Sequence, residues 1–123
     1  RQCMVDGKKV AAPKVRGKEM DFYWLETLDQ LEPGYFGILE PARGEIVTWP
    51  KALMLVPGVA FDTKCHRIGY GQGFYDRYLA TWSEHTTIAL AFDFQIYDAV
   101  PFEETDICPQ MVLTETTEYT DRK

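Results

Sequence analysis

The chain has 123 residues, of which 46% are hydrophobic and 14% are aromatic. This composition is enough for one packed domain over residues 1–123 and excludes a disordered tail. No apolar run reaches the roughly 18–20 residues of a membrane span, and the formal net charge of −6 argues against a broad nucleic-acid surface. We therefore expect a single domain that binds neither membrane nor nucleic acid.

Charge and cysteine content indicate where a ligand would bind and in which compartment the protein works. Residues 1–77 hold 11 Lys/Arg and 10 Asp/Glu, whereas residues 78–123 hold 2 and 9, so an anionic ligand is expected against the first part. The three cysteines, Cys3, Cys65 and Cys108, are irregularly spaced, which is not typical of a disulfide framework and indicates a reducing, cytoplasmic compartment. The neighbours Cys65 and His66 are predicted to be ordinary loop residues rather than a catalytic pair.

The first third of the chain predicts short elements. Residues 10–13 and the aromatic run at 22–25 are expected to be strands, the first ending at its proline. Residues 27–31 are expected to form one helical turn. Gly34 precedes residues 35–43, and Gly37 and Pro41 interrupt them, which predicts a loop there.

The centre and the end of the chain predict an α/β unit. The apolar run at 52–56 is typical of a strand buried on both faces, and aromatic residues between 74 and 82 recur at helical spacing. A second apolar run follows at 87–92, so the strand, helix and strand predict a parallel pair. We expect a last short strand at 111–114 and a polar, frayed tail at 116–123.

One connection is unusually long. Residues 57–72 join the first strand of this unit to its helix in about sixteen residues, whereas α/β units commonly use about 2–6. The connection also follows the carboxyl end of a parallel strand, which is where open α/β sheets bind ligands.

The end of this connection carries glycines at alternate positions, Gly69, Gly71 and Gly73. Such glycines let backbone N–H groups turn inward, and the N-terminus of the following helix favours an anion at the same place. Arg67 and Arg77 add full positive charges. The pattern predicts a phosphate site, although it matches neither GxGxxG nor GxxxxGK[ST], and a flexible turn before a helix remains the alternative.

Carboxylates near the glycines are candidate metal ligands. Asp76 falls in the first turn of the expected helix, where a negative charge is favourable without any further function. It is also placed to hold Mg²⁺ beside bound phosphates, since Mg²⁺ uses one or two carboxylates together with phosphate oxygens. Asp62 and Asp106 are the candidates for a second carboxylate.

The same stretch resembles the signature of the 5-formyltetrahydrofolate cyclo-ligase family. The resemblance lies in VPGVAFD at 56–62 and RIGYGQGFYDRYL at 67–79. Three further pieces are similar in the same order and extend the resemblance over nearly the whole chain: Pro13-Lys14 with Met20-Asp21-Phe22, GILEP at 37–41, and Asp106 with VLTE at 112–115.

The resemblance implies both a fold and a reaction. The fold is a three-layer, Rossmann-like α/β structure with a mostly parallel sheet, here without its N-terminal elements. The family uses ATP and Mg²⁺ to phosphorylate the formyl oxygen of 5-formyltetrahydrofolate. The N10 amine then closes on that carbon and phosphate leaves, which gives 5,10-methenyltetrahydrofolate. The implied protein is a monomeric ligase whose substrate is a reduced folate.

Site residues follow from the resemblance by motif position. Arg67 and Asp76 are the catalytic residues it implies, and Asp76 and Asp106 are the Mg²⁺ ligands. The implied nucleotide-binding residues are Arg67, Ile68, Gly69, Tyr70, Gly71, Gln72, Gly73, Phe74 and Tyr75. The implied folate-binding residues are Phe36, Tyr70, Gly71, Gln72, Gly73 and Phe74. An ordinary core aromatic is the alternative for Phe36.

Two departures separate this sequence from the family pattern. Gln110, after Pro109, stands where the family has a second acidic residue. Family members also begin with a basic helix whose cations reach the nucleotide, and residues 1–9 are too short to be that helix. We therefore expect the C-terminal part of a cyclo-ligase that is inactive by itself. The alternatives are a nucleotide-binding relative without catalysis and a purely structural α/β domain.

Overall fold

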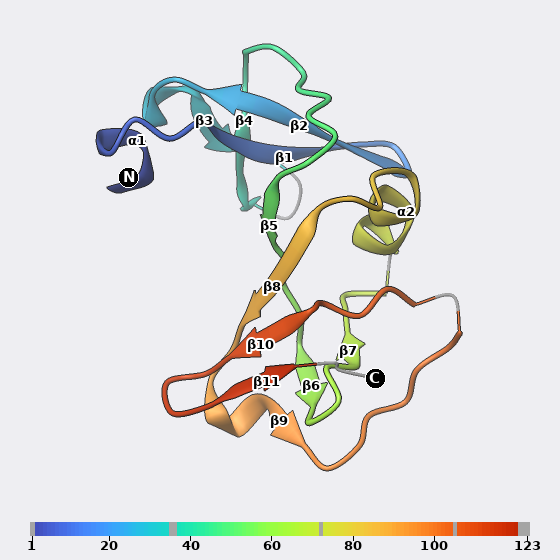
Figure 1. Cartoon of the computed structure of the whole chain (residues 1–123). Helices are drawn as coiled ribbons and strands as arrows, with labels where there is room; N and C mark the ends of the chain where they lie inside the picture. The colour runs from blue at the N-terminus through green and yellow to red at the C-terminus, as the bar shows by residue number, and fades with distance from the viewer. Residues whose placement is uncertain (1, 35–36, 72, 105, 121–123) are drawn as a thin grey trace. The chain divides into compact units, whose positions relative to one another are not determined.

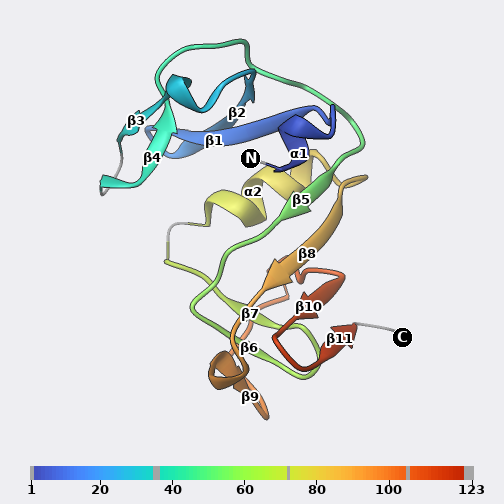
Figure 2. The same ribbon diagram turned by 90° about the vertical axis from the view of Figure 1, so that its left-hand side faces the viewer.

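The computed structural model describes residues 2–34, 37–71, 73–104 and 106–120. The chain divides into two compact units, Arg1–Trp49 and Pro50–Lys123 (Figures 1 and 2). No helix in the described ranges combines the length and the apolar character needed to cross a membrane.

The first unit is built on an antiparallel hairpin. Strand β1 (Val10–Arg16) pairs with β2 (Glu19–Leu25) along its whole length. Pro13 lies inside β1, so the prediction that the strand ends at this proline is wrong. Among the described residues β1 pairs with no strand other than β2, so its other edge carries no ladder hydrogen bonds and the missing N–H group of Pro13 costs none there.

A second, smaller hairpin completes this unit. The remaining elements are α1 (Gln2–Val5), the 3₁₀ turn η1 (Leu28–Gln30), β3 (Leu31–Pro33) and β4 (Leu39–Pro41). The helical turn expected at 27–31 is confirmed by η1. The loop expected at 35–43 is wrong in part, because β4 pairs antiparallel with β3. Three-residue strands are too short to show alternation of apolar and polar residues, which explains why the pattern missed them.

The second unit contains a four-stranded sheet in the order β11-β10-β8-β5 (Figure 1). Its strands are β5 (Leu53–Leu55), β8 (Thr86–Leu90), β10 (Met111–Leu113) and β11 (Glu118–Thr120). Both β5 and β10 run parallel to β8, and helix α2 (Phe74–Thr81) lies between β5 and β8 in the chain. The predicted α/β class with a mostly parallel sheet is confirmed, as is the strand–helix–strand unit.

The long connection contributes two strands to a three-stranded sheet, and the third strand comes from later in the chain. The sheet consists of β6 (Ala60–Asp62), β7 (Arg67–Ile68) and β9 (Ile96–Tyr97), the last preceded by the 3₁₀ turn η3 (Asp93–Gln95). Strands β6 and β7 form an antiparallel hairpin, and β9 runs parallel to β6. In both views this sheet lies beyond the carboxyl ends of β5 and β8 (Figures 1 and 2). The expected connection is therefore structured.

Two further expectations are corrected. Burial of residues 52–56 on both faces is wrong, because Met54 is 6% exposed whereas Leu53 is 62% and Leu55 57% exposed. Neighbouring side chains of a strand point to opposite faces, and only the face that carries Met54 is covered. The frayed tail expected at 116–123 is wrong over β11, which pairs antiparallel with β10. Residues 121–123 lie outside the described part.

The core of the second unit joins its two sheets. Its centre is formed by side chains with no solvent exposure, Phe61, Cys65, Ala89 and Val112. Phe61 comes from β6, Ala89 from β8 and Val112 from β10, so one apolar cluster holds both sheets together. Cys65 adopts φ +68° in the β6–β7 turn, and its Sγ donates to the Tyr119 carbonyl at 3.4 Å.

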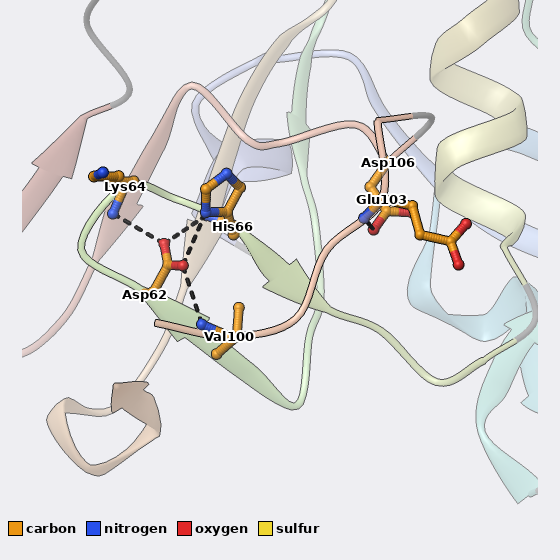
Figure 3. A network of polar contacts seen from close by, with 6 residues as sticks. All are labelled: Asp62, Lys64, His66, Val100, Glu103 and Asp106. Atoms are coloured by element: carbon orange, nitrogen blue, oxygen red, sulfur yellow. Dashed lines mark hydrogen bonds and ion pairs between the residues drawn. The ribbon is translucent and has the colours of Figure 1, made fainter. Parts of the chain in front are cut away.

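A buried carboxylate fixes the β6–β7 turn from inside (Figure 3). Asp62 is 2% exposed, and its Oδ1 accepts hydrogen bonds from the backbone N–H groups of Lys64 and His66, both at 3.0 Å. Its Oδ2 accepts from His66 Nδ1 at 2.8 Å and from the Val100 N–H at 3.2 Å. Burial by itself raises the pKa of this carboxyl, but the four donors outweigh it and hold the pKa below its ordinary value of 3.8.

Truncation of the central aromatic tests the shared core. We expect Phe61→Ala to lower the free energy of unfolding by about 3–5 kcal/mol, because it leaves a cavity between the two sheets. Phe94→Ala is the matched control, since Phe94 is 71% exposed and should change stability by about 0.5 kcal/mol or less. Urea unfolding measures both variants. Equal losses for the two would contradict a core centred on Phe61.

The lowered pKa of Asp62 predicts an acid-dependent loss of stability. The stabilisation is fully present above the unfolded-state pKa and is lost as pH falls through about 4 toward the lower folded-state pKa. Asp62→Asn should reduce stability at neutral pH and flatten the decline below about pH 4. Denaturant unfolding at a series of pH values measures this. If the free energy of unfolding of the variant falls with pH as steeply as that of the wild type, Asp62 is not the source of the acid-dependent loss.

Candidate functional site

The side chain of Arg67 joins three segments of the second unit. Arg67 opens β7, and its side chain is only 7% exposed. Nη1 donates to the Pro57 carbonyl at 2.7 Å, just after β5, and Nη2 donates to Asp76 Oδ1 at 3.4 Å in α2. The guanidinium also lies 5.9 Å from the centre of the Tyr75 ring. Its charge is therefore held in one orientation between β5 and α2.

Asp76 has one committed carboxylate oxygen and one open oxygen. Its Oδ1 accepts the N–H of Ile107 at 3.0 Å as well as the bond from Arg67. Its Oδ2 accepts no hydrogen bond from the residues that the structure describes. The side chain is 26% exposed in the first turn of α2. It is thus fixed by one oxygen while the other can bind a ligand.

The three alternate glycines have different physical roles. Gly71 adopts φ +89°, and a side chain there would meet no atom of the described residues within 4 Å, so there is room for a ligand at this backbone. A side chain at Gly69 would lie 2.9 Å from Arg67 Nη1, so this glycine makes room for the guanidinium. Gly73 is the N-cap of α2 with φ +69°. Both positive φ values favour glycine over residues with a side chain.

The start of α2 is electrostatically suited to an anion. The first N–H groups of a helix have no partner within the helix, and the helix dipole is positive at this end. Gly73 has no side chain with which to cap them. Arg77 adds a second cation on α2, where its guanidinium lies 5.4 Å from the centre of the Phe74 ring.

Two tyrosines on this segment differ in environment. Burial raises the pKa of the Tyr75 hydroxyl, an effect that the positive charge of Arg67 partly opposes. The phenol therefore stays protonated at neutral pH and can donate a hydrogen bond. Tyr70 is 72% exposed and presents its ring to solvent.

The predicted carboxylates are brought together only in part. Asp106 Oδ2 accepts the N–H of Glu103 at 2.9 Å (Figure 3), and the next residue, Ile107, donates to Asp76. The Asp106 segment and the start of α2 are therefore in contact. Asp62 is bound by four donors and is not the second carboxylate of this site. Within the described ranges, no three His, Cys, Asp or Glu residues are grouped to hold a metal ion. The predicted site residues Phe36 and Gln72 lie outside those ranges.

The first unit holds a separate hollow of about 310 Å³. Its lining residues come from β1 and from the β3–β4 hairpin: Lys14, Val15, Glu32, Pro33, Gly34, Glu40 and Pro41. Glu40 is buried, and its Oε2 accepts the Val15 N–H at 2.9 Å. Two of the stretches that resemble the family, Pro13-Lys14 and 37–41, thus meet around one hollow.

Sequence reasoning missed the groups that hold Arg67 and Asp76 in place. These are the carbonyl of Pro57 and the N–H of Ile107, and backbone groups leave no residue-type signal. It also missed His66 as the partner of Asp62. An Asp whose side chain accepts the N–H two residues later is typical of a turn, and this is the signal that could have shown it. Cys65 and His66 bind different partners, in agreement with the prediction that they are not a pair.

Comparison with known proteins identifies the chain's relatives. It is 37% identical over 93 residues to the probable 5-formyltetrahydrofolate cyclo-ligase of Schizosaccharomyces pombe, which covers 66% of this chain and 45% of that protein. It is 34% identical over 100 residues to the 5-formyltetrahydrofolate cyclo-ligase of Mus musculus, which covers 73% and 49%. The chain therefore spans about half the length of the curated relatives it matches.

Solved structures and a family model agree with these relatives. The NMR structure of Aquifex aeolicus 5,10-methenyltetrahydrofolate synthetase matches with a TM-score of 0.82 at 34% identity, over 99% of this chain and 62% of that one. A synthetase from Mycoplasma pneumoniae, 23% identical with a TM-score of 0.62, shares the fold. The model of the 5-formyltetrahydrofolate cyclo-ligase family matches residues 1–115, and the chain therefore belongs to this family.

Proposed function

We propose that the chain, as part of a longer cyclo-ligase, converts 5-formyltetrahydrofolate to 5,10-methenyltetrahydrofolate at the expense of ATP, and that residues 67–76 bind the ATP phosphates. The observation that carries this proposal is the arrangement after β5. A fixed guanidinium, an open glycine backbone, a helix N-terminus and a half-open carboxylate follow one another within ten residues. Family membership supports the same reaction.

The residues suit phosphoryl transfer. This chemistry needs positioning and neutralisation of charge more than it needs a protein nucleophile. Arg67 offers a cation whose orientation is already fixed by the Pro57 carbonyl, so little reorganisation is needed when a phosphate binds. The backbone at Gly71 and the start of α2 offer N–H groups to phosphate oxygens.

The same residues fit a magnesium ion bound together with ATP. Mg²⁺ commonly uses one or two carboxylates and takes its other ligands from phosphates and water, so a group of three protein ligands is not required. Asp76 would hold it through Oδ2, and Asp106 would contribute from the adjoining segment. When bound, Mg²⁺ neutralises charge on the transferring phosphate. Gln110 is neutral and exposed, and its backbone N–H donates to Thr87, so it adds no charge.

The folate is proposed to lie beside the phosphates, so that its formyl oxygen can attack the γ-phosphate. The exposed ring of Tyr70 offers an apolar face for such a ligand. The complete set of folate-binding residues that we propose is Phe36, Tyr70, Gly71, Gln72, Gly73 and Phe74.

Formation of the methenyl product tests the function directly. The protein is mixed with ATP, Mg²⁺ and 5-formyltetrahydrofolate, and the near-ultraviolet absorbance of the product is followed. We expect product that depends on both ATP and Mg²⁺ when these residues are part of a full-length cyclo-ligase, and no product from residues 1–123 by themselves. ATP binding without product in the full-length protein would favour the alternative of a nucleotide-binding relative without catalysis, and rapid turnover by residues 1–123 would contradict the expectation that they are inactive alone. Absence of ATP binding would contradict the proposed site.

Gly71 provides a test of backbone contact with the phosphates. We expect Gly71→Ala to weaken ATP binding about tenfold or more, equivalent to roughly 1.4 kcal/mol, because the added methyl group blocks close approach. Gly17→Ala is the control, since Gly17 also has a positive φ (+62°) and open space around it but lies in the β1–β2 turn. Calorimetry measures both. If Gly71→Ala and Gly17→Ala bind ATP with equal affinity, the backbone at Gly71 does not contact the phosphates.

Asp76 provides a test of the metal. Asp76→Asn keeps an oxygen that can accept the Ile107 N–H but removes the charge that Mg²⁺ needs. We expect Mg²⁺ to strengthen ATP binding to the wild type and to have little effect on the variant. Asp93→Asn, an exposed acid bound to Thr116, should behave as the wild type. Wild-type Mg²⁺ dependence in Asp76→Asn would leave Asp76 as a partner of the helix dipole only.

A further inference from the structure

One segment of the second unit reaches from the buried Asp62 to the candidate site. We call it the return segment, residues 98–104 and 106–107, which follows β9. It passes the β6–β7 turn first and then runs towards Asp76 at the start of α2. Figure 3 shows Asp62 beside Val100, with Glu103 and Asp106 farther along the same segment.

The first end of the return segment is attached at two points. The Val100 N–H donates to Asp62 Oδ2 at 3.2 Å. The Phe102 ring stacks on the His66 imidazole with centroids 3.6 Å apart and planes 5° apart. His66 in turn lies 2.8 Å from the same Asp62 oxygen. Both attachments therefore depend on Oδ2 of one carboxylate.

The second end of the return segment holds Asp76. Glu103 and Asp106 are tied together by two bonds, Asp106 N–H to the Glu103 carbonyl at 3.0 Å and Glu103 N–H to Asp106 Oδ2 at 2.9 Å. Ile107 follows directly, and its N–H donates to Asp76 Oδ1 at 3.0 Å. Ile107 and Arg67 thus donate to the same oxygen of Asp76, and the placement of Ile107 helps to leave Oδ2 open.

We infer that Asp62 is a positioning residue for the metal–nucleotide site. It fixes Val100 and, through His66, Phe102. The return segment then places the Ile107 N–H against Asp76 Oδ1, beside the bond from Arg67, which leaves Oδ2 without a hydrogen bond from the described residues. Asp62 itself does not touch ATP or Mg²⁺. This inference rests on the proposed function for its consequence, although the link from Asp62 to Ile107 can be measured without any ligand.

The two oxygens of Asp62 accept from different donors, so Asp62→Asn can break one set of hydrogen bonds and keep the other. Oδ1 serves the hairpin turn itself, and Oδ2 serves His66 Nδ1 and Val100. In Asp62→Asn, the single oxygen can keep only one of these pairs. If it keeps the turn, the new amide places N–H groups against the Val100 N–H, so this bond is lost, whereas His66 Nδ1 can accept from the amide in its other tautomer. The attachment of the return segment through Val100 is then lost while the hairpin can persist.

The experiment compares Asp62→Asn with Asp93→Asn, which removes the same charge at a site that does not touch the return segment. The Ile107 amide resonance is read in ¹⁵N–¹H spectra without ligand. ATP binding is then measured by calorimetry over a series of Mg²⁺ concentrations. We expect Asp62→Asn to shift the Ile107 resonance and to raise the Mg²⁺ concentration needed for half-maximal enhancement about tenfold or more, as the loss of outer partners of metal ligands commonly does. Asp93→Asn should change neither.

A second variant protects the test against loss of folding. Phe102→Ala removes only the stacking contact, and Phe102 is 55% exposed, so this variant should fold even if Asp62→Asn does not. It should shift the Ile107 resonance in the same direction by a smaller amount and raise the Mg²⁺ midpoint.

Three outcomes decide the matter. Shifts at Ile107 with a raised Mg²⁺ midpoint support the inference. If Asp62→Asn folds and its Ile107 resonance does not move, the inference is overturned, because Asp62 then affects only stability. If only Phe102→Ala folds, an unmoved Ile107 resonance in that variant overturns the inference in the same way. A moved Ile107 with an unchanged Mg²⁺ midpoint also overturns it. If the wild type fails to bind ATP, the proposed function fails, whereas the Ile107 shift still reports the link.

Discussion

The guanidinium of Arg67 is the contact on which the candidate site depends. It is almost fully buried, and it spans from the carbonyl that follows β5 to the carboxylate at the start of α2. A buried cation that lost either partner would be unstable, since a charge in a poorly solvated place needs compensation. The glycine at position 69 leaves room for this contact, because a Cβ there would lie 2.9 Å from Nη1 and the guanidinium would have to shift. The backbone that follows can then remain open at Gly71.

Two carboxylates of the second unit are used in opposite ways. Asp62 is buried with both oxygens bound, so its role is to hold a turn and a neighbouring segment. Asp76 is partly exposed and has one oxygen held by Arg67 and Ile107. The number of donors and the exposure, rather than the residue type, therefore separate a structural acid from one that can bind a ligand. The return segment joins the two, which couples the packing of the β6–β7 turn to the site.

The sequence predicted the features that depend on apolar runs and on glycine. The parallel pair β5 and β8, helix α2 and the glycine turn before it are confirmed. The hairpin of β6 and β7 was missed because strands of three and two residues carry no periodicity. Burial of Leu53 and Leu55 was wrong because an apolar run does not say which face another element covers. The site residues Arg67 and Asp76 were predicted by motif. The hydrogen bond between them is held in place by the Pro57 carbonyl and the Ile107 N–H, and because these are backbone groups, the residue types at 57 and 107 do not reveal them. The roles of Phe36 and Gln72 stay predictions.

Replacement of Mg²⁺ by Mn²⁺ in the complex with ATP tests the central claim most directly. Bound Mn²⁺ broadens amide resonances of nearby residues, so it reports where the metal and the phosphates lie. Our account predicts selective broadening of Gly71, Gly73, Asp76, Asp106 and Ile107 upon addition of Mn²⁺ with ATP, reversed by excess Mg²⁺. Resonances of the β1–β2 hairpin, including Gly17, serve as the reference. Broadening that spares residues 71–76 and appears instead around other acidic residues of the chain would contradict the account.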